Sequence, residues 1–248
     1  MRRKTTAAVL FSAAILGGSA AAQTPQASAA RAVIAATKVV TRADAASDFR
    51  AVRVTMPPNA MSSMSAADGI LYQVSGSTTV SVGGKAKILS AGEGLFVAGG
   101  TAAALKAGAD EPSTLLHFLV VPHADPNRPL ETAPATATEL YRTAAPIPDH
   151  KPGMHDLNLT RVTFPAHTPS NAPHYRSGAA LYYVIAGTGA NTIEGKTETR
   201  GPGSLIYEPF GLVHQWANPG DEPLTFLIFN ISPEGTAAVL PGTPVKAP

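Results

Sequence analysis

The sequence predicts an all-β protein built from two tandem β-barrels of similar construction, and three observations support this prediction. A set of residues recurs along the chain at a fixed offset. Short runs of β-branched and aromatic residues alternate with turns that contain glycine. No apolar pattern with the 3.6-residue period of a helix extends beyond two turns. Glycine and proline, with 22 residues each among 248, supply the turns that many short strands need.

The repeat appears when the chain is compared with itself. At an offset of 111 residues, the two copies stay in register without a gap for about forty residues. The pairs in register are Tyr72 and Tyr183, Gly76 and Gly187, Gly92 and Gly203, Gly100 and Gly211, and the Asp-Glu-Pro tripeptides at 110–112 and 221–223. Upstream, residues 53–57 match residues 161–165 at an offset of 108, so the second copy carries three extra residues. One domain is therefore predicted to occur twice.

Each copy is predicted to contain the same succession of strands. The expected strands are residues 71–74, 78–82, 94–97 and 113–121 in the first copy, and 181–185, 190–193, 204–207 and 224–231 in the second. A Gly-Lys turn follows the second strand in both copies. Short strands that fold back on one another and leave few open edges indicate a barrel or sandwich.

Residues 1–22 have the pattern of a secretory signal peptide. Three basic residues precede an uncharged stretch that is too short to span a bilayer, and Ala20-Ala21-Ala22 then forms a typical cleavage site. We therefore expect an exported protein, periplasmic or secreted, that begins at Gln23. Cleavage changes the formal charge from 19 − 17 = +2 to 16 − 17 = −1, because it removes three basic residues and no acid.

Composition excludes several function classes. A nearly neutral mature chain has no surplus of basic residues to neutralise phosphates, which argues against a nucleic-acid partner. No later apolar run is long enough to span a membrane, so no membrane association is expected after cleavage. The chain has no cysteine, which excludes disulfides, thiolate metal ligands and a cysteine nucleophile. No G-x-S-x-G elbow supports a hydrolase.

Changes in composition divide the chain into six parts. The predicted parts are the signal peptide at 1–22, a loosely ordered N-terminal arm at 23–45 with one edge strand at 32–40, an N-terminal barrel at 46–121, a linker at 122–152, a C-terminal barrel at 153–233, and a tail at 234–248. The linker and the tail are rich in proline, alanine, threonine and glycine, which is typical of connecting segments. For residues 138–142 of the linker, the sequence predicts either one turn of helix or an edge strand.

Two motifs in the second copy resemble those of the cupin superfamily. The spacing G-x5-P-x-G-x2-H-x3-N, which resembles the second cupin motif, is complete at Gly203, Pro209, Gly211, His214 and Asn218. The first cupin motif, G-x5-H-x-H-x3-4-E-x6-G, is matched only in part. His174 and Gly187 fit it, whereas Arg176 stands at the second histidine position and Ala180 at the glutamate position.

The resemblance implies a two-domain cupin, or bicupin, made of two jelly-roll-like barrels of facing antiparallel sheets. It also implies a small-molecule ligand, and it leaves a homo-oligomer open. Cupin barrels often hold one divalent metal on three histidines and one glutamate. Their reactions include oxygenation, decarboxylation and isomerisation, so the fold predicts no single activity.

A metal site in the C-terminal barrel is one interpretation of these residues. His174 and His214 are two candidate ligands, because strand alternation lets both point into the same cavity. His167, in the longer loop of the second copy, is the candidate third ligand, with water completing the shell. The permanent charge of Arg176 opposes such a site, because it repels a divalent ion in a poorly solvated cavity. The identity of the metal is left open.

A metal-free pocket for a small anion is the leading interpretation. The Arg176 guanidinium would hold a carboxylate in a two-point contact. His174, Tyr182 and His214 would add hydrogen bonds, and Trp216 would form an apolar wall. We therefore expect an exported bicupin that binds a small anion, with a metal-dependent dioxygenase, decarboxylase or isomerase as the alternative.

A ligand-free structural protein is the second alternative. In that case His214 and Asn218 would form hydrogen bonds within the core, and Arg176 would pair with an acid such as Glu208. Whether the chain is an enzyme, and which residues would be catalytic, stays open at this stage.

The first copy lacks metal ligands. By the repeat, Ser63 and Ser65 stand at its histidine positions, Gly69 at its glutamate position, and Ala103 and Ala107 at the positions of His214 and Asn218. None of these side chains binds a transition metal well. The N-terminal barrel is therefore expected to serve as a packing partner or an apolar pocket.

Overall fold

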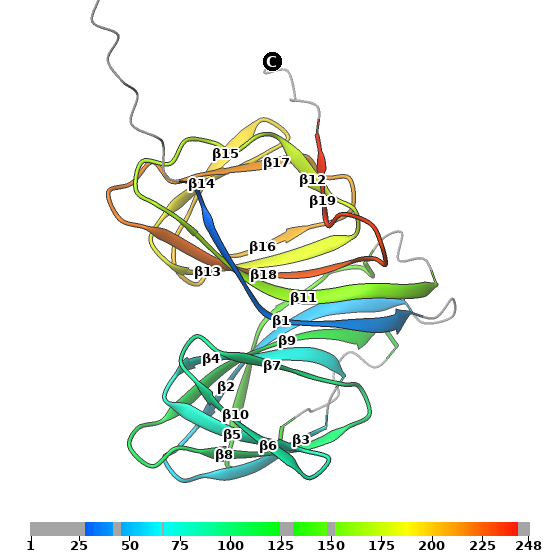
Figure 1. Ribbon diagram of the computed structural model, residues 1–248, viewed down its shortest axis with the longest axis vertical. Helices are drawn as coiled ribbons and strands as arrows, with labels where there is room; N and C mark the ends of the chain where they lie inside the picture. The colour runs from blue at the N-terminus through cyan, green and yellow to red at the C-terminus, as the bar shows by residue number, and fades with distance from the viewer. Residues whose placement is uncertain (1–27, 42–45, 66, 125–130, 148–151, 243–248) are drawn as a thin grey trace, which may run out of the picture.

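The computed structural model describes residues 28–41, 46–65, 67–124, 131–147 and 152–242, and these residues form 19 strands. They contain no helix, so none of them forms a membrane-spanning helix. The all-β prediction is confirmed, and the strands divide into two barrels stacked one above the other (Figure 1). The predicted signal peptide at 1–22 lies outside the described residues.

The N-terminal barrel consists of a five-stranded and a four-stranded antiparallel sheet. The first sheet has the order β10 (Thr136–Arg142), β2 (Ser47–Met56), β9 (Ser113–Pro122), β4 (Asp68–Ser75) and β7 (Gly94–Val97). The second has the order β3 (Met61–Ser65), β8 (Ala102–Ala107), β5 (Ser77–Val82) and β6 (Lys85–Ser90). Apolar side chains from both sheets fill the space between them, as in other closed β structures.

The C-terminal barrel repeats this plan with two five-stranded sheets. The first has the order β1 (Ala30–Thr41), β11 (Gly153–Phe164), β18 (Leu224–Pro233), β13 (Ala179–Ala186) and β16 (Leu205–Glu208). The second has the order β15 (Lys196–Arg200), β14 (Gly189–Ile193), β17 (His214–Ala217), β12 (His174–Arg176) and β19 (Val239–Pro241). The candidate residues of the second copy lie on β12, β13, β16 and β17, which face one another across the barrel.

In each barrel, one of the repeated glycines packs closely against the carbonyl group of a repeated proline. Gly76 has a φ of +67°, and a Cβ atom there would lie 2.6 Å from the carbonyl oxygen of Pro112. Gly187 has a φ of +73°, and its Cβ atom would lie 2.3 Å from the carbonyl oxygen of Pro223. Only glycine tolerates both the positive φ and the close approach, which explains why these residues recur at one offset.

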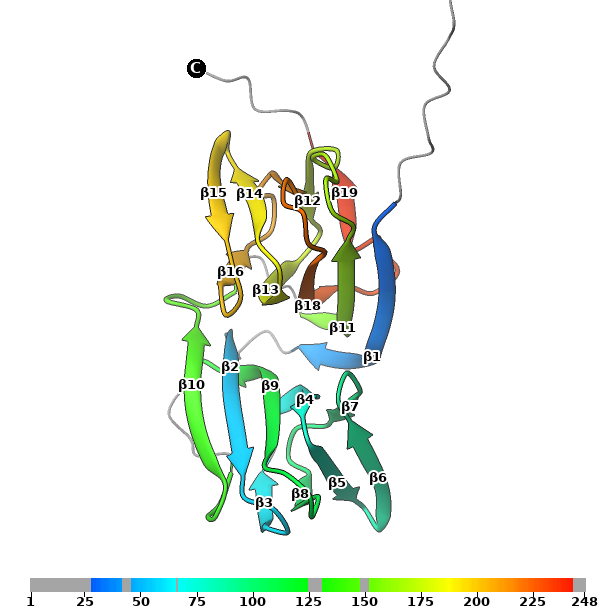
Figure 2. The same ribbon diagram turned by 90° about the vertical axis from the view of Figure 1, so that its left-hand side faces the viewer.

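The two barrels share an apolar core between their five-stranded sheets. Phe49 of β2 and Phe118 of β9 pack against Phe229 of β18, with ring centroids 5.2 and 5.7 Å apart. Because side chains alternate along a strand, β18 turns Phe229 to this interface and Phe226 into its own barrel. Figure 2 shows the two barrels packed along this interface, with β1 beside it. The barrels therefore form one packed unit.

Residues 30–41 form an edge strand, where the sequence predicted a shorter one at 32–40 within a loosely ordered arm. They form β1, which pairs with β11 from Ala30 opposite Thr163 to Thr41 opposite Gly153. Val39 is buried in the core between the barrels. Thus β1, which precedes the N-terminal barrel in the sequence, completes a sheet of the C-terminal barrel. The arm is low in aromatic residues, and its order comes from backbone pairing, which composition does not reveal.

The predicted linker and tail also contribute strands. β10 pairs with β2 at the edge of the N-terminal barrel, so residues 136–142 take the strand alternative. β19 pairs with β12, directly beside the candidate site. Only β19 was missed, because the tail was predicted to be a connecting segment and an edge strand needs only one paired side and little apolar patterning.

Candidate functional site

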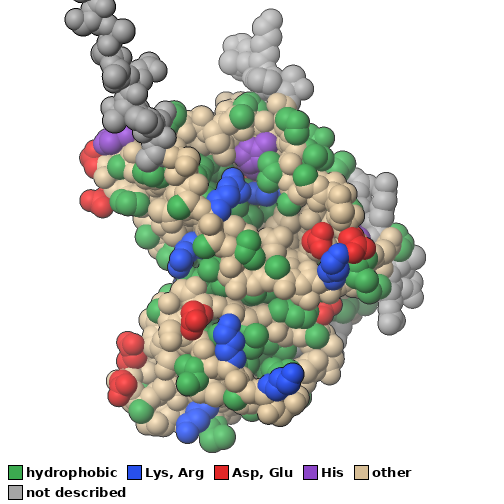
Figure 3. Space-filling model, viewed as in Figure 1, with side chains coloured by type: hydrophobic (Ala, Val, Ile, Leu, Met, Phe, Trp, Pro, Cys, Tyr) green, Lys and Arg blue, Asp and Glu red, His purple; other side chains and the backbone are tan. Residues whose placement is uncertain are grey.

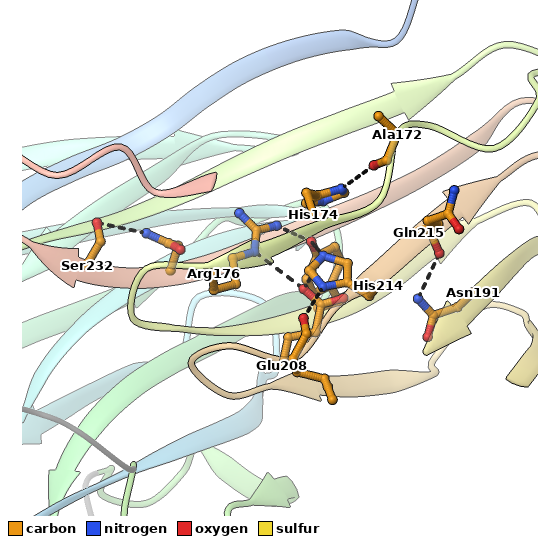
Figure 4. Close-up of polar contacts among 11 residues, drawn as sticks. Ala172, His174, Arg176, Asn191, Glu208, His214, Gln215 and Ser232 are labelled. Carbon is orange, nitrogen blue, oxygen red and sulfur yellow. Dashed lines mark hydrogen bonds and ion pairs between the residues drawn. The ribbon is translucent and has the colours of Figure 1, made fainter. Parts of the chain in front are cut away.

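His174 and His214 come together inside the C-terminal barrel. The two residues lie directly opposite each other on β12 and β17, and their ring centroids are 4.2 Å apart (Figure 4). Both side chains are buried, because they occupy the alternate positions of their strands that face the core. The structure therefore places two imidazole rings, forty residues apart in sequence, side by side as expected.

The backbone orients both rings in the same way. Nδ1 of His174 lies 2.8 Å from the carbonyl oxygen of Ala172, and Nδ1 of His214 lies 3.0 Å from that of Leu212. A carbonyl oxygen only accepts, so Nδ1 carries the hydrogen in each ring. Burial lowers the pKa of His174 below its usual value, and the charges of His214 and Arg176 add to this effect. Nε2 of His174 therefore carries a lone pair at neutral pH.

Arg176 has its charge compensated inside the barrel. Its side chain is 3% exposed, and its Nε lies 3.4 Å from Oε2 of Glu208. A terminal nitrogen of the guanidinium donates to the hydroxyl of Tyr182, and the guanidinium carbon lies 5.3 Å from the centre of that ring. Burial raises the pKa of Tyr182, so its hydroxyl stays protonated. The predicted pairing of Arg176 with Glu208 is present.

Glu208 has a larger role than the sequence indicated. It lies on β16 directly opposite Ala180, the residue at the glutamate position of the first cupin motif. Its side chain is 0% exposed and points into the barrel, so a carboxylate enters the site from the neighbouring strand. Two signals could have revealed this role: the inward position that alternation assigns to Glu208, and the small side chain of Ala180 beside it.

Glu208 and His214 make an unusual contact. Oε2 of the carboxylate lies 2.9 Å from Nε2 of His214, the nitrogen that carries the lone pair in a neutral ring. Two acceptors at this distance repel each other unless a proton or a metal cation lies between them. The second carboxylate oxygen, Oε1, is buried and has no hydrogen-bond partner. The site thus has a concentration of lone pairs that favours a cation.

Three of the predicted site residues, His167, Trp216 and Tyr182, have surroundings that differ from those predicted. His167, the candidate third ligand, is wrong in that role, because its side chain is 68% exposed and its Nε2 lies 3.2 Å from Asp221. The extra loop residues carry it to the surface. Trp216 lies in the packed core rather than on an open wall, with its ring 5.6 Å from that of Tyr182 and 4.8 Å from that of Phe226. Tyr182 belongs both to this stack and to the polar site.

The site is close to the surface on one side of the barrel. Figure 3 shows a hollow over the C-terminal barrel in which histidine and Lys or Arg side chains gather. In the described part of the chain, no three His, Cys, Asp or Glu side chains are already arranged as a metal cluster.

In the N-terminal barrel, the residue at the position of His174 is not the one that the repeat predicted. Met64 lies opposite Ala103, just as His174 lies opposite His214, whereas Ser63 is exposed. Ser63 is therefore wrong as the equivalent of His174. This shift by one residue places the thioether of Met64 inside the barrel. The position still carries no histidine, as the sequence predicted.

The comparisons with known proteins agree with this architecture. A family described as a cupin domain matches residues 160–230. Salicylate 1,2-dioxygenase from Pseudaminobacter salicylatoxidans is 13% identical, covers 73% of this chain and 70% of its own, and has a TM-score of 0.52. Oxalate decarboxylase from Bacillus subtilis is 16% identical, covers 83% of this chain and 73% of its own, and has a TM-score of 0.55. No curated protein matches the sequence.

These identities show a likeness of fold, and the family match lies on the barrel that contains His174 and His214. The motif in the second copy, the two stacked barrels and the family match all agree. Residues 160–230 thus match the cupin domain family, and the chain shares its two-barrel fold with both similar structures, with the candidate site in the C-terminal barrel.

Proposed function

We propose that the C-terminal barrel is a metal-dependent centre that acts on a small organic acid, with His174, His214 and Glu208 holding one divalent transition metal. The contact between Nε2 of His214 and Oε2 of Glu208 carries this proposal, because two acceptors 2.9 Å apart require a proton or a metal cation between them, and a metal is the cation that we propose. The two Nδ1–H groups bound to backbone carbonyls are the second support, because metal-binding histidines usually donate their other nitrogen in this way.

The donor set fits such a metal. Two imidazole nitrogens and one carboxylate are ligands that suit iron, manganese, nickel, copper or zinc. Oε1 of Glu208, which is buried without a partner, is available without breaking any hydrogen bond. A bound metal of this kind would supply Lewis-acid or redox chemistry to a substrate beside it.

The other polar residues would position the substrate. Arg176 carries the permanent positive charge that a carboxylate substrate requires, and Tyr182 fixes its guanidinium from one side. The names of the two similar structures, a salicylate dioxygenase and an oxalate decarboxylase, refer to small carboxylates. Oxygenation or decarboxylation of a small carboxylate is therefore the activity that we propose for this chain.

Metal content tests the proposal. Protein purified without a chelator is expected to contain about one equivalent of transition metal per chain by mass spectrometry of the elements. His214→Ala is expected to abolish it, because it removes a ligand. His167→Ala, which changes an exposed histidine of the same barrel, should leave the metal in place. Equal metal content in these two variants, or none in the unmodified protein, would overturn the proposal.

A metal-free anion site is the second candidate, favoured by the buried guanidinium of Arg176 beside the neutral His174. In this case chelator-treated protein is expected to melt at a higher temperature in benzoate or oxalate, since a ligand that binds only the folded state stabilises it. The double variant Arg176→Met, Glu208→Leu should lose this shift. A chain that binds neither metal nor carboxylate would instead support the ligand-free structural alternative.

We also propose that the protein is exported. The charged start, the short apolar stretch and Ala20-Ala21-Ala22 support this proposal. The full chain expressed in a bacterium should yield a periplasmic or secreted product whose mass corresponds to a start at Gln23. A product of unchanged mass that stays in the cytoplasm would contradict it.

A further inference from the structure

A second candidate site lies on the inner face of the β14–β15 hairpin. A cleft of about 300 Å³ is lined by Asn191, Ile193, Glu194, Lys196, Glu198 and Arg200. The ladder sets Asn191 opposite Glu198 and Ile193 opposite Lys196, so these side chains share one face of the hairpin. Ile193 packs against the barrel core, which identifies this face as the inner one. The volume is at the lower end of the range for small-molecule pockets.

The deepest residue of the cleft has an unused acceptor. Asn191 is 1% exposed, and its Nδ2 donates to the carbonyl oxygen of Gln215 at 3.3 Å, as Figure 4 shows. Its Oδ1 is buried without a hydrogen-bond partner. Trp216 lies directly opposite Asn191 on β17, and its indole Nε1–H is also without a partner. Trp216 itself belongs to the core and does not line the cleft, so the free acceptor of Asn191 is the group that a ligand hydroxyl would complement as a donor.

The sister barrel shows that the fold does not need these polar groups. At the same offset of 111 residues, Val80 takes the place of Asn191 and Leu105 takes the place of Trp216. Val80 and Leu105 are paired across β5 and β8, as Asn191 and Trp216 are across β14 and β17. Both apolar residues are buried in the N-terminal core. Packing alone therefore does not explain an amide and an indole in the second copy.

The charges around the cleft favour an uncharged ligand. Lys196 and Arg200 each pair with Glu198, at 2.5 Å in both cases. Hydrogen bonding and charge from Lys196, together with the charge of Arg200, hold the pKa of Glu198 below its usual value, so it stays ionised. Glu194 supplies a second carboxylate, so two acids and two bases line the cleft without surplus charge. Nε of Arg200 is buried without a partner and is a further free donor.

From these observations we infer that the β14–β15 cleft binds a neutral polyhydroxyl compound, such as a monosaccharide, through Asn191 and the charged side chains at its rim. Planar amide, carboxylate and guanidinium groups offer both donors and acceptors to neighbouring hydroxyls. This site is separate from His174 and Glu208, so it does not depend on the metal proposal.

Trp216 allows a direct test, because it is the single tryptophan of the chain. Chelator-treated full-length protein is titrated with D-glucose, D-ribose and glycerol, and its fluorescence is followed. A saturable change with at least one of these probes is expected. Asn191→Val, which installs the residue of the sister barrel, should weaken binding at least about tenfold, the effect of losing roughly one good hydrogen bond.

The stability of the same variant separates a binding role from a structural one. Asn191→Val should melt close to the temperature of the unmodified chain, because removing a buried amide oxygen without a partner offsets the loss of the hydrogen bond from Nδ2 to Gln215. Val80→Ala in the sister barrel is the control that should lower the melting temperature and leave binding unchanged. The inference is overturned if none of the three probes gives a saturable signal, or if Asn191→Val binds them as well as the unmodified chain does.

Discussion

Glu208→Leu is expected to destabilise the protein by about 3–5 kcal/mol, because it leaves the buried guanidinium of Arg176 without a countercharge. Both side chains lie inside the barrel, with Arg176 3% and Glu208 0% exposed. Tyr182 accepts a hydrogen bond from Arg176 but supplies no negative charge, since burial raises its pKa. The measurement is urea unfolding of chelator-treated protein, followed by the fluorescence of Trp216.

The control for this prediction removes both charges. Arg176→Met combined with Glu208→Leu should recover most of the lost stability, because apolar side chains of similar size fill the space without a buried charge. The coupling energy from the double-mutant cycle should therefore be large. If Glu208→Leu alone unfolds at the same urea concentration as the double variant, the carboxylate does not compensate Arg176 and the prediction is wrong.

Removal of residues 1–41 is expected to cost on the order of 5 kcal/mol, a large share of the stability of an ordinary domain. β1 forms an eleven-pair ladder with β11 and buries Val39 between the barrels. Its loss leaves the backbone groups of β11 unpaired along that edge and exposes the apolar side chains beneath. The C-terminal barrel should unfold at a lower urea concentration.

The matched chain lacks only residues 1–22 and keeps β1, so it should unfold as the mature protein does. A synthetic peptide of residues 28–41 should raise the stability of the shorter chain when added in excess, because it can pair with β11. Identical unfolding curves for the two shortened chains would show that β1 contributes little.

The repeat and the strand pattern predicted most of the fold. Gly76 and Gly187 recur at one offset because each ends a strand against the carbonyl group of the equivalent proline of its own copy, and only glycine fits there. The convergence of His174 and His214 followed from strand alternation and motif spacing. Such features are local or periodic, so one sequence contains enough information to find them.

The missed features depend on how separate strands align. Glu208 enters the site because β16 pairs with β13 in one particular register, which sets it opposite Ala180. Met64 replaces Ser63 as the inward residue because the offset changes from 108 to 111 within this region, so the repeat leaves the exact register open. A shift of one residue exchanges the two faces of a strand, and the sequence of one strand does not reveal it.

The placement of β1 has a consequence for how the protein folds. This strand leaves the ribosome before the N-terminal barrel, yet its partners run from Gly153 to Thr163 and are made only after that whole barrel. Pairings this distant in sequence form slowly, since a long loop must close before the contact is gained. The early strand stays without its partner meanwhile, and at high concentration it meets the same edge on a neighbouring chain. Exchange of β1 between two molecules is thus the misassembly that we expect for this architecture.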